Sequence, residues 1–529
     1  MKKVLLFLAT TLFLVSNLYA WPGQVLDSLE TGYHNSVGLT WDGQHLWLSD
    51  HKADQLACID PTNGKIIRTL PSPGYWPAGL AWDGQYLWNL DSHQNKIFKV
   101  DPANGAILFS MDAPGKGPEG LTWDGATLWL SDARGKKLMR LDLSDGTAVK
   151  ILDAPATNPQ GLTWDGKYLW CADRIEDEIY MIDPESGAVL MILDAPGPYA
   201  RGMAWDGKNL WNTDYQTDHL YKLVRQDNDQ YRLAHTRHSL VTLTHQVRID
   251  GPGRLQHLEV YFAEPQDQPQ QEIRHIACLP QVFGQAMDKW QQPVRIFKYN
   301  NTGADSVITT VMQVDAQISA ITYFIFPDQV GKLEDIPREI LGLYTANGSK
   351  YQLNDPYIHG LSKTIVGDET NPYWMTRKIF DYVRLHLEYE LTGGWNIAPV
   401  VLQRGNGSCS EYSFAFIALC RAAGIPARYV GAIVVRGDDA SLDEVFHRWP
   451  EVYLPNYGWL PVDPQGGDKP TPREQAMCIG KLSNRFLITT RGGGDSEYLG
   501  WYYNYNESVV TDPQVHVNID AFGEWEPLD

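Results

Sequence analysis

The feature that most constrains the fold is a motif that recurs every 41 residues through the first 230 residues. Gly38–Asp50 has the sequence Gly-Leu-Thr-Trp-Asp-Gly-Gln-His-Leu-Trp-Leu-Ser-Asp, and four further copies follow with small changes. They span Gly79–Asp91, Gly120–Asp132, Gly161–Asp173 and Gly202–Asp214. A regular internal repeat of this length indicates one supersecondary unit used several times over.

Each unit is expected to form four short strands. In the first unit, Leu39–Trp41 enters an Asp-Gly turn and Leu46–Leu48 leaves it. Leu56–Ile59 then enters a Pro-Thr-Asn-Gly turn and Lys65–Leu70 leaves that turn. Four strands in about 40 residues is the size of a propeller blade. The sequence therefore predicts an all-β propeller over residues 21–230.

The two ends of the repeat region suggest how the ring closes. Gln24–Leu29 resembles the fourth strand of other units, such as Ala188–Leu193, whereas the fifth unit lacks its Asp-x-x-x-Gly element near position 224. The first strand is therefore expected to complete the last of five blades. Six blades are the alternative, if Tyr231–His235 supplies a strand of its own. The repeated Trp residues are expected to pack between blades, and the Asp that closes each motif to accept hydrogen bonds rather than to bind a metal.

Residues 1–20 have the pattern of a secretory signal peptide. Lys2 and Lys3 precede an apolar run from Val4 to Val15, and the segment ends with Ala20. The run is too short for a membrane span, which needs about 20 residues. Cleavage is expected after Ala20, giving a periplasmic or secreted protein without a membrane anchor.

Charge and cysteine content exclude several classes of protein. The chain has 44 Lys+Arg against 64 Asp+Glu, a net charge of −20, and no basic run. Non-specific nucleic-acid binding is therefore not expected, because it needs cationic surface to displace counterions from phosphates. The six cysteines lack metal-ligand spacing such as C-x-x-C, so no metal or other cofactor is predicted.

Two further domains are expected after the repeats. Residues 236–334 alternate strand-like runs with Pro- and Gln-rich loops, which favours a β-sandwich. The runs are Val241–Val247, Leu255–Ala263, Val294–Tyr299, Ser306–Gln313 and Ile318–Ile325. Residues 335–529 begin with helical periodicity and then mix helices with strands, so an α+β domain is predicted there.

Cys409, His447 and Asp463 form a constellation suited to thiol chemistry. Cys409 begins a nearly all-apolar predicted helix, Ser410–Ala423, where unpaired backbone N–H groups and the helix dipole favour a thiolate. His447 could take the thiol proton, and Asp463 could orient the imidazole ring. The alternative from the residues alone is that Cys409 is a small core residue and His447 a surface group.

Four ordered motifs resemble the core of the transglutaminase-like superfamily. They are Gly407-Ser-Cys-Ser-Glu-Tyr412, Cys420-Arg-Ala-Ala-Gly-Ile-Pro-Ala-Arg428, His447-Arg-Trp-Pro-Glu-Val-Tyr453 and Gly458-Trp-Leu-Pro-Val-Asp-Pro464. The resemblance implies a papain-like fold with Cys409 as nucleophile, His447 as general base and Asp463 as orienting acid. It also raises the possibility that Gln403, six residues before the cysteine, contributes to an oxyanion hole.

The resemblance implies thiol acyl chemistry but covers cross-linking enzymes, peptidases, amidases and inactive scaffolds. We expect an exported enzyme, a cysteine protease or other hydrolase, that attacks an amide of a protein or peptide and forms an acyl-enzyme. Hydrolysis is favoured over transamidation, because water is abundant outside the cytoplasm. The alternative is a binding protein whose propeller recognises a protein or glycan ligand while the thiol fold is only a scaffold.

Overall fold

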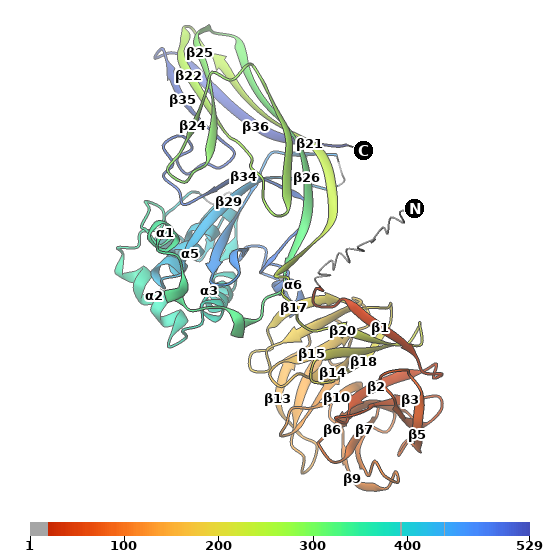
Figure 1. The fold of residues 1–529 in the computed structure, drawn as a ribbon. Coiled ribbons are helices and arrows are strands. Elements are labelled where there is room, and N and C mark those ends of the chain that lie inside the picture. The colour runs from red at the N-terminus through yellow and green to blue at the C-terminus, as the bar shows by residue number, and fades with distance from the viewer. Residues whose placement is uncertain (1–19, 392–393, 438–439, 529) are drawn as a thin grey trace, which may run out of the picture.

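The structure, a computed structural model, describes residues 20–391, 394–437 and 440–528. Figure 1 shows three parts: a ring of sheets coloured red to yellow, a group of helices in cyan, and long green strands joined by blue strands from the C-terminus. The predicted signal peptide lies outside the described residues except for Ala20. No helix in the described part of the chain is long and apolar enough to cross a membrane.

Within the described residues, five four-stranded antiparallel sheets lie between Val25 and Val224. The first three are β2(Ser36–Trp41)–β3(Leu46–Asp50)–β4(Gln55–Ile59)–β5(Ile66–Pro71), β6(Pro77–Trp82)–β7(Leu87–Asp91)–β8(Lys96–Val100)–β9(Ile107–Asp112) and β10(Pro118–Trp123)–β11(Leu128–Asp132)–β12(Lys137–Leu141)–β13(Ala148–Asp153). The last two are β14(Pro159–Trp164)–β15(Leu169–Asp173)–β16(Glu178–Ile182)–β17(Val189–Asp194) and β18(Ala200–Trp205)–β19(Asn209–Asp214)–β20(His219–Val224)–β1(Val25–Glu30). The predicted propeller architecture is confirmed.

A glycine in the innermost strand of each sheet lets neighbouring sheets approach closely. A Cβ atom on Gly38 would lie 2.1 Å from the carbonyl oxygen of Ala78 in the next sheet. A Cβ on Gly202, in the fifth sheet, would lie 2.7 Å from the amide nitrogen of Leu39 in the first. Only glycine fits such an approach. The contact between the fifth and first sheets shows that the ring is closed.

The N-terminal strand takes part in that closure. β1 pairs antiparallel with β20, so it supplies the outer strand of the last sheet, as predicted. Tyr231–His235 does not add a further sheet to the ring. It belongs to β21(Tyr231–Asp250), which pairs with β26(Ser306–Tyr323) outside the propeller.

The Asp that closes each motif is a hydrogen-bond acceptor, as predicted, since Asp50 accepts the backbone N–H groups of Asn35, Lys52 and Ala53. The Asp of each Asp-Gly turn is a second acceptor, which was not predicted. In the first unit Asp42 Oδ1 accepts the backbone N–H groups of Gln44 and His45, and Oδ2 accepts the indole N–H of Trp47 at 2.9 Å. The same carboxylate–indole bond joins Asp83, Asp124, Asp165 and Asp206 to the Trp five residues on. In each sheet a partly buried turn carboxylate therefore binds both its own turn and the indole of the following strand.

Two sheets form the predicted sandwich, and the chain's last strands complete them. One sheet has the order β23(Gln271–Leu279)–β26–β21–β36(His516–Pro527)–β30(Ser441–Asp443), with β33(Lys481–Leu482) beside β26. The other has the order β24(Gly284–Met287)–β25(Pro293–Gly303)–β22(Arg254–Ala263)–β35(Tyr505–Thr511).

The sandwich differs from expectation in two ways. Residues 335–529 do not form one continuous unit, because β35 and β36 return to pair with β22 and β21. Those sandwich strands would otherwise present open edges, and a distant segment covers them. The runs predicted as separate strands at Ser306–Gln313 and Ile318–Ile325 join in the single strand β26, whose extra length holds β23, which was not predicted.

The α+β core lies between these sandwich strands in sequence. Its helices are α1(Arg338–Tyr344), α2(Pro356–Val366), α3(Pro372–His386), α4(Ala398–Arg404), α5(Cys409–Ala422) and α6(Pro472–Ala476), preceded by the 3-10 turns η1(Pro327–Gln329) and η2(Leu333–Asp335). Its sheet has the order β32(Gly458–Pro461)–β31(His447–Leu454)–β29(Ala427–Val434)–β34(Phe486–Gly492), and β27(Glu388–Tyr389) pairs with β28(Asn406–Gly407). α5 is buried by α2, α3, α4 and this sheet.

The core domain also rests on the propeller. α6 packs on β17, the outer strand of the fourth sheet, and Arg473 forms an ion pair with Glu178 at 2.6 Å. Arg377 of α3 donates to the carbonyl oxygen of Val189 in the same strand. β17 is buried for this reason, whereas β5, β9 and β1 carry exposed apolar side chains.

Candidate active site

The first turn of α5 is fixed by a capping box that holds Cys409 in place. The Ser408 hydroxyl accepts the backbone N–H of Glu411, and the Glu411 carboxylate accepts the N–H of Ser408 at 3.1 Å. Glu411 is buried, yet its oxygens also bind Asn396 and pair with Arg404 at 2.9 Å. A buried carboxylate is stable only when it is paired in this way. Cys409 therefore stands at a rigid helix N-terminus.

His447 and Asp463 come from neighbouring strands of the core sheet. His447 opens β31, and Asp463 follows β32, which pairs with β31. The distance from His447 Nε2 to Asp463 Oδ2 is 2.9 Å, while Asp463 Oδ1 accepts the N–H groups of Gln465 and Gly466. The bond to the carboxylate makes Nε2 the donor, which leaves Nδ1 as the ring nitrogen available to the thiol.

The charges of the three side chains favour an ion pair. Burial raises the pKa of the Cys409 thiol, but the hydrogen bond and charge of His447 outweigh it and lower that pKa below its usual value. Burial lowers the pKa of His447, yet Asp463 and the thiol raise it to about 10. Burial also opposes ionisation of Asp463, but His447 and two backbone N–H groups keep the pKa of its carboxyl low. All three shifts favour the charged forms, namely thiolate, imidazolium and carboxylate.

The structure therefore brings together all three residues predicted from the sequence, while their roles in a reaction stay a prediction. Gln403 is different, because it is exposed on α4, and no hydrogen bond to the site residues is found for it among the described residues. It provides no support for an oxyanion hole at that position.

Arg448 is a neighbour of this site that the sequence analysis did not single out. Its side chain is fully buried, and its guanidinium lies over the rings of Tyr503 at 4.3 Å, Tyr429 at 4.4 Å and Trp395 at 4.8 Å. Among the described residues it has no carboxylate partner, and its Nε and Nη1 atoms have no acceptor. Its backbone N–H and its positive charge both lower the pKa of Cys409. The sequence feature that could have identified Arg448 is its position directly after His447 in a strand that is otherwise mostly apolar.

Two adjoining cavities lie between the sandwich and the core sheet, on the His447–Asp463 side of the site. The first has a volume of about 370 Å³, and its lining includes both of these residues together with Trp449, Cys478 and Lys481. Burial, with a smaller effect from Asp463, raises the pKa of Cys478 to about 12, so this second thiol stays protonated.

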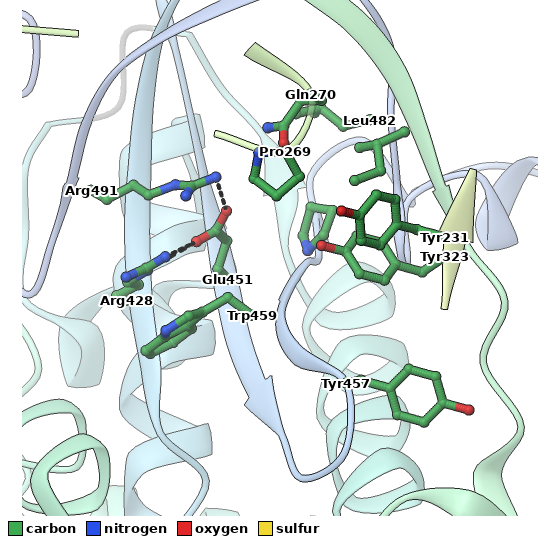
Figure 2. Close-up of a pocket in the computed structure, with 12 residues that line it drawn as sticks. Tyr231, Pro269, Gln270, Tyr323, Arg428, Glu451, Tyr457, Trp459, Leu482 and Arg491 are labelled. Atoms are coloured by element: carbon green, nitrogen blue, oxygen red, sulfur yellow. Dashed lines mark hydrogen bonds and ion pairs between the residues drawn. The ribbon is translucent and has the colours of Figure 1, made fainter. Parts of the chain in front are cut away.

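The second cavity, of about 300 Å³, shares Ile321, Pro461 and Leu482 with the first. Figure 2 shows Glu451 in its wall, paired with Arg428 and Arg491. The ring of Trp459 lies beside these ion pairs, and the rings of Tyr231 and Tyr323 lie across the cavity from them. The sandwich thus supplies one wall of the space beside the candidate site.

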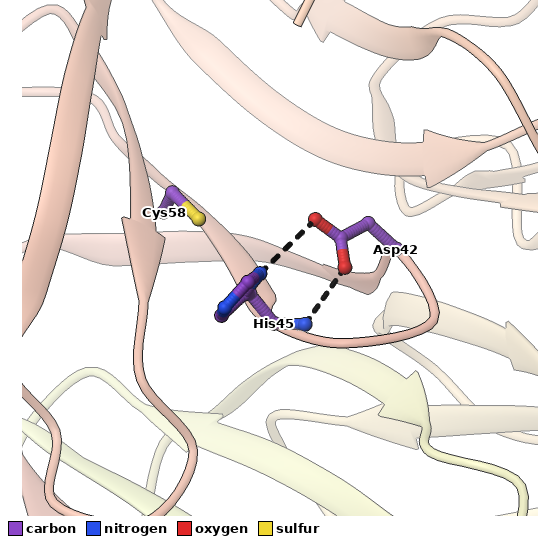
Figure 3. Close-up of side chains that lie close together, drawn as sticks. All are labelled: Asp42, His45 and Cys58. Atoms are coloured by element: carbon purple, nitrogen blue, oxygen red, sulfur yellow. Dashed lines mark hydrogen bonds and ion pairs between the residues drawn. The ribbon is translucent and has the colours of Figure 1, made fainter.

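One group of three side chains with metal-binding atoms occurs in the described part of the chain, and it lies in the propeller. Figure 3 shows Asp42, His45 and Cys58, whose ligand atoms lie within 4.8 Å of one another. Asp42 already accepts two backbone N–H groups and an indole N–H. In the next units a cation stands where Cys58 stands and pairs with the equivalent aspartate, as in Lys99–Asp83 and Arg140–Asp124. The three side chains lie close together because the repeat places these positions side by side in every unit, and their proximity does not indicate a metal centre.

Comparisons with known proteins support the family resemblance of the core. Residues 359–464 match the model of the transglutaminase-like superfamily. A protein-glutamine gamma-glutamyltransferase from Pseudomonas aeruginosa is 33% identical over 114 residues, which are 20% of this chain and 15% of that protein. An uncharacterized protein from Haemophilus influenzae is 26% identical over 224 residues, covering 36% of this chain and 60% of the relative.

A solved structure gives a wider but weaker match. It is that of a proposed cysteine protease from Cytophaga hutchinsonii, which aligns with 56% of this chain and 100% of its own at 14% identity and a TM-score of 0.39. The chain spans 60% and 15% of the lengths of the two curated relatives. This chain therefore contains a transglutaminase-like domain, as the motifs predicted, attached to a propeller and a sandwich.

Proposed function

We propose that this protein is an exported thiol enzyme that cleaves amide bonds of proteins or peptides. The observation that carries the proposal is the His447–Asp463 hydrogen bond of 2.9 Å together with the lowering of the Cys409 thiol pKa by His447, at the N-terminus of α5. The lowered thiol pKa and the raised imidazole pKa favour the thiolate and imidazolium forms that the reaction uses.

The proposed reaction has two steps. The Cys409 thiolate attacks the amide carbon, and the imidazolium of His447 donates its Nδ1 proton to the nitrogen as the C–N bond breaks. An amine or ammonia leaves, and a thioester to Cys409 remains. Neutral His447 then takes a proton from water while the water oxygen attacks the thioester, the C–S bond breaks, and a carboxylic acid leaves. The thiolate–imidazolium pair is restored, with Asp463 holding the ring throughout.

Transamidation is the second candidate, and the name of the Pseudomonas relative favours it. In that reaction a primary amine, instead of water, resolves the thioester. We place hydrolysis first because the protein is proposed to work outside the cytoplasm, where water is abundant and free amine acceptors are scarce.

Labelling with an amide-directed thiol electrophile tests the enzyme proposal. We expect wild-type protein and Cys478→Ala to be labelled and Cys409→Ala to remain unlabelled, because Cys478 stays a neutral thiol.

A glutamine-containing protein incubated with a labelled primary amine then distinguishes hydrolysis from transamidation. Amine incorporation in place of free acid would overturn hydrolysis. Absence of both products, and of labelling at Cys409, would instead support the binding-protein alternative.

Export is tested by the mass of the protein recovered from outside the cytoplasm. We expect the mature chain to begin at Trp21, after removal of the apolar segment that ends at Ala20. Recovery of external protein that retains residues 1–20 would contradict this part of the proposal.

A further inference from the structure

The propeller repeat makes it possible to separate residues that build the ring from residues that do not. The position just before the inner glycine differs in every unit, while glycine and the following Trp are kept. The five residues at this position are Val37, Ala78, Glu119, Gln160 and Arg201. Because Ala78 occupies it with a methyl group, the fold itself needs no polar side chain there. The three polar residues call for another explanation.

These three side chains meet inside the ring, and we call them the axial cluster. Arg201 Nη1 donates to Gln160 Oε1 at 2.5 Å and lies 3.3 Å from Glu119 Oε2. Glu119 belongs to the third sheet and Arg201 to the fifth, so their contact passes the fourth sheet on its inner side. Burial raises the pKa of Glu119, and the charges of Arg201, Arg174 and Arg134 oppose that effect. Within the axial cluster one cation faces one carboxylate, and Arg174 and Arg134 add positive charge nearby.

Aromatic rings adjoin the axial cluster at the same end of the ring. Arg201 lies over Tyr215 at 5.7 Å, and His51 stacks on Tyr215 at 5.9 Å and on Trp76 at 4.7 Å. Trp76 is 49% exposed, which leaves much of its indole open to solvent. Tyr199, which is also exposed, has Arg174 over its ring at 5.9 Å. Charged and aromatic groups therefore share one end of the propeller.

Two polar atoms at this end are buried without a hydrogen-bond partner among the described residues. They are Arg201 Nε and His51 Nδ1. Buried polar atoms in folded proteins usually bind protein, water or ligand atoms, so these two atoms are available to a bound group. The aspartates that close the motifs do not accept hydrogen bonds from these two atoms. In the first unit, for example, Asp50 is occupied by the N–H groups of Asn35, Lys52 and Ala53.

We propose that this end of the propeller binds an acidic sugar, meaning a saccharide that carries a carboxylate. Arginine guanidinium groups bind carboxylates, and Arg201 and Arg174 supply them. Glu119 provides carboxylate oxygens that can accept sugar hydroxyls, whereas a simple anion would be repelled by Glu119. The open faces of Trp76 and Tyr199 suit the C–H groups of a pyranose ring. A neutral sugar would leave the arginines unused.

Calorimetric titration of the full mature chain with trigalacturonate, against maltotriose as a neutral trisaccharide, tests the proposal. We expect saturable binding of the acidic sugar alone, equally in wild type and in Cys409→Ala. Trp76→Ala should weaken binding about tenfold by removing the stacking surface. Phe109→Ala is the matched control, because it removes an exposed aromatic ring from the outer strand β9 and should leave binding unchanged.

A double variant keeps the test valid if Trp76→Ala fails to fold. Glu119→Gln with Arg201→Met removes both charges together, so neither is left buried alone, and binding of trigalacturonate should be lost. The proposal is overturned by absence of binding at millimolar trigalacturonate, by equal binding of maltotriose, or by binding that both variants retain. Binding of trialanine, a peptide carboxylate without a sugar, at equal strength would also overturn it.

Discussion

Asp42 in the propeller and Asp463 in the core domain make the same three kinds of hydrogen bond. Each uses one carboxylate oxygen for the N–H groups two and three residues ahead and the other oxygen for a ring N–H at 2.9 Å. The ring is the indole of Trp47 in one case and the imidazole of His447 in the other. An indole does not titrate in water, whereas an imidazole does. The same hydrogen-bond arrangement stabilises a propeller sheet in one region and orients a titratable imidazole in the other.

The strongest test of this comparison removes the titrating partners. We expect Cys409→Ala and His447→Ala to lower turnover on the order of a millionfold, because both groups take part in bond making. Asp463→Asn should retain some activity, with a loss of about 10⁴-fold, since the acid only orients and stabilises the ring. Asp42→Asn is the matched control and should leave turnover unchanged. Equal activity losses at Asp42 and Asp463 would contradict the comparison.

Arg448 should have the next largest effect. Its charge lowers the pKa of Cys409, so Arg448→Met should move the acid limb of the activity profile to higher pH. The loss below neutral pH should be roughly tenfold for each unit of that movement. The alkaline limb reflects loss of the imidazolium, whose pKa is about 10, and should move less.

Arg448→Lys provides the control for packing, because it keeps the charge among the same rings. It should restore most of the wild-type profile. Loss of activity in both variants without any change in the shape of the pH profile would show that Arg448 only fills space.

The propeller, in contrast, should respond to changes in stability rather than in chemistry. Deleting Trp21–Leu29 removes β1 and exposes the edge of β20, so the melting temperature should fall by several degrees or more. Val25→Lys is the matched control, because Val25 is exposed and its backbone pairing stays intact. An unchanged melting temperature after the deletion would mean that β1 contributes nothing to closure.

The smallest expected effect is that of Asp42→Asn on stability. The amide keeps an acceptor for the backbone N–H groups but weakens the bond to Trp47, at a cost of about 1 kcal/mol. Thermal unfolding should show a small fall in melting temperature, while the labelling of Cys409 remains as in wild type. A large fall would indicate that the ring depends on single units rather than on their sum.

The sequence predicted those parts of the molecule whose structure is specified by residues close together in the chain. The period of 41 residues and its Asp-Gly turns placed the propeller strands, and the motif around Cys409 placed α5 within one residue. Non-local pairing was harder to predict. Nothing near β35 or β36 in sequence specifies that they join β22 and β21, more than 240 residues away.

The same limit applies to single side chains. Arg448 could be read as a surface residue until the rings of Tyr429 and Tyr503, from β29 and the segment before β35, are placed around it. Glu119 and Arg201 are 82 residues apart, and only ring closure brings them into contact. Pattern within a strand predicts which face a residue occupies, but not which distant charge it meets there.

The most direct test of the central claim is a pH titration of the thiolate absorbance of Cys409, measured as the difference between wild type and Cys409→Ala. The proposed ion pair predicts that thiolate appears at clearly lower pH than for an ordinary cysteine, because the pKa of Cys409 is lowered by His447 and Arg448. Asp463→Asn should weaken this effect by removing the carboxylate that holds the imidazole charged. Thiolate absorbance that first appears near pH 9, the ordinary range of a cysteine, would contradict the account.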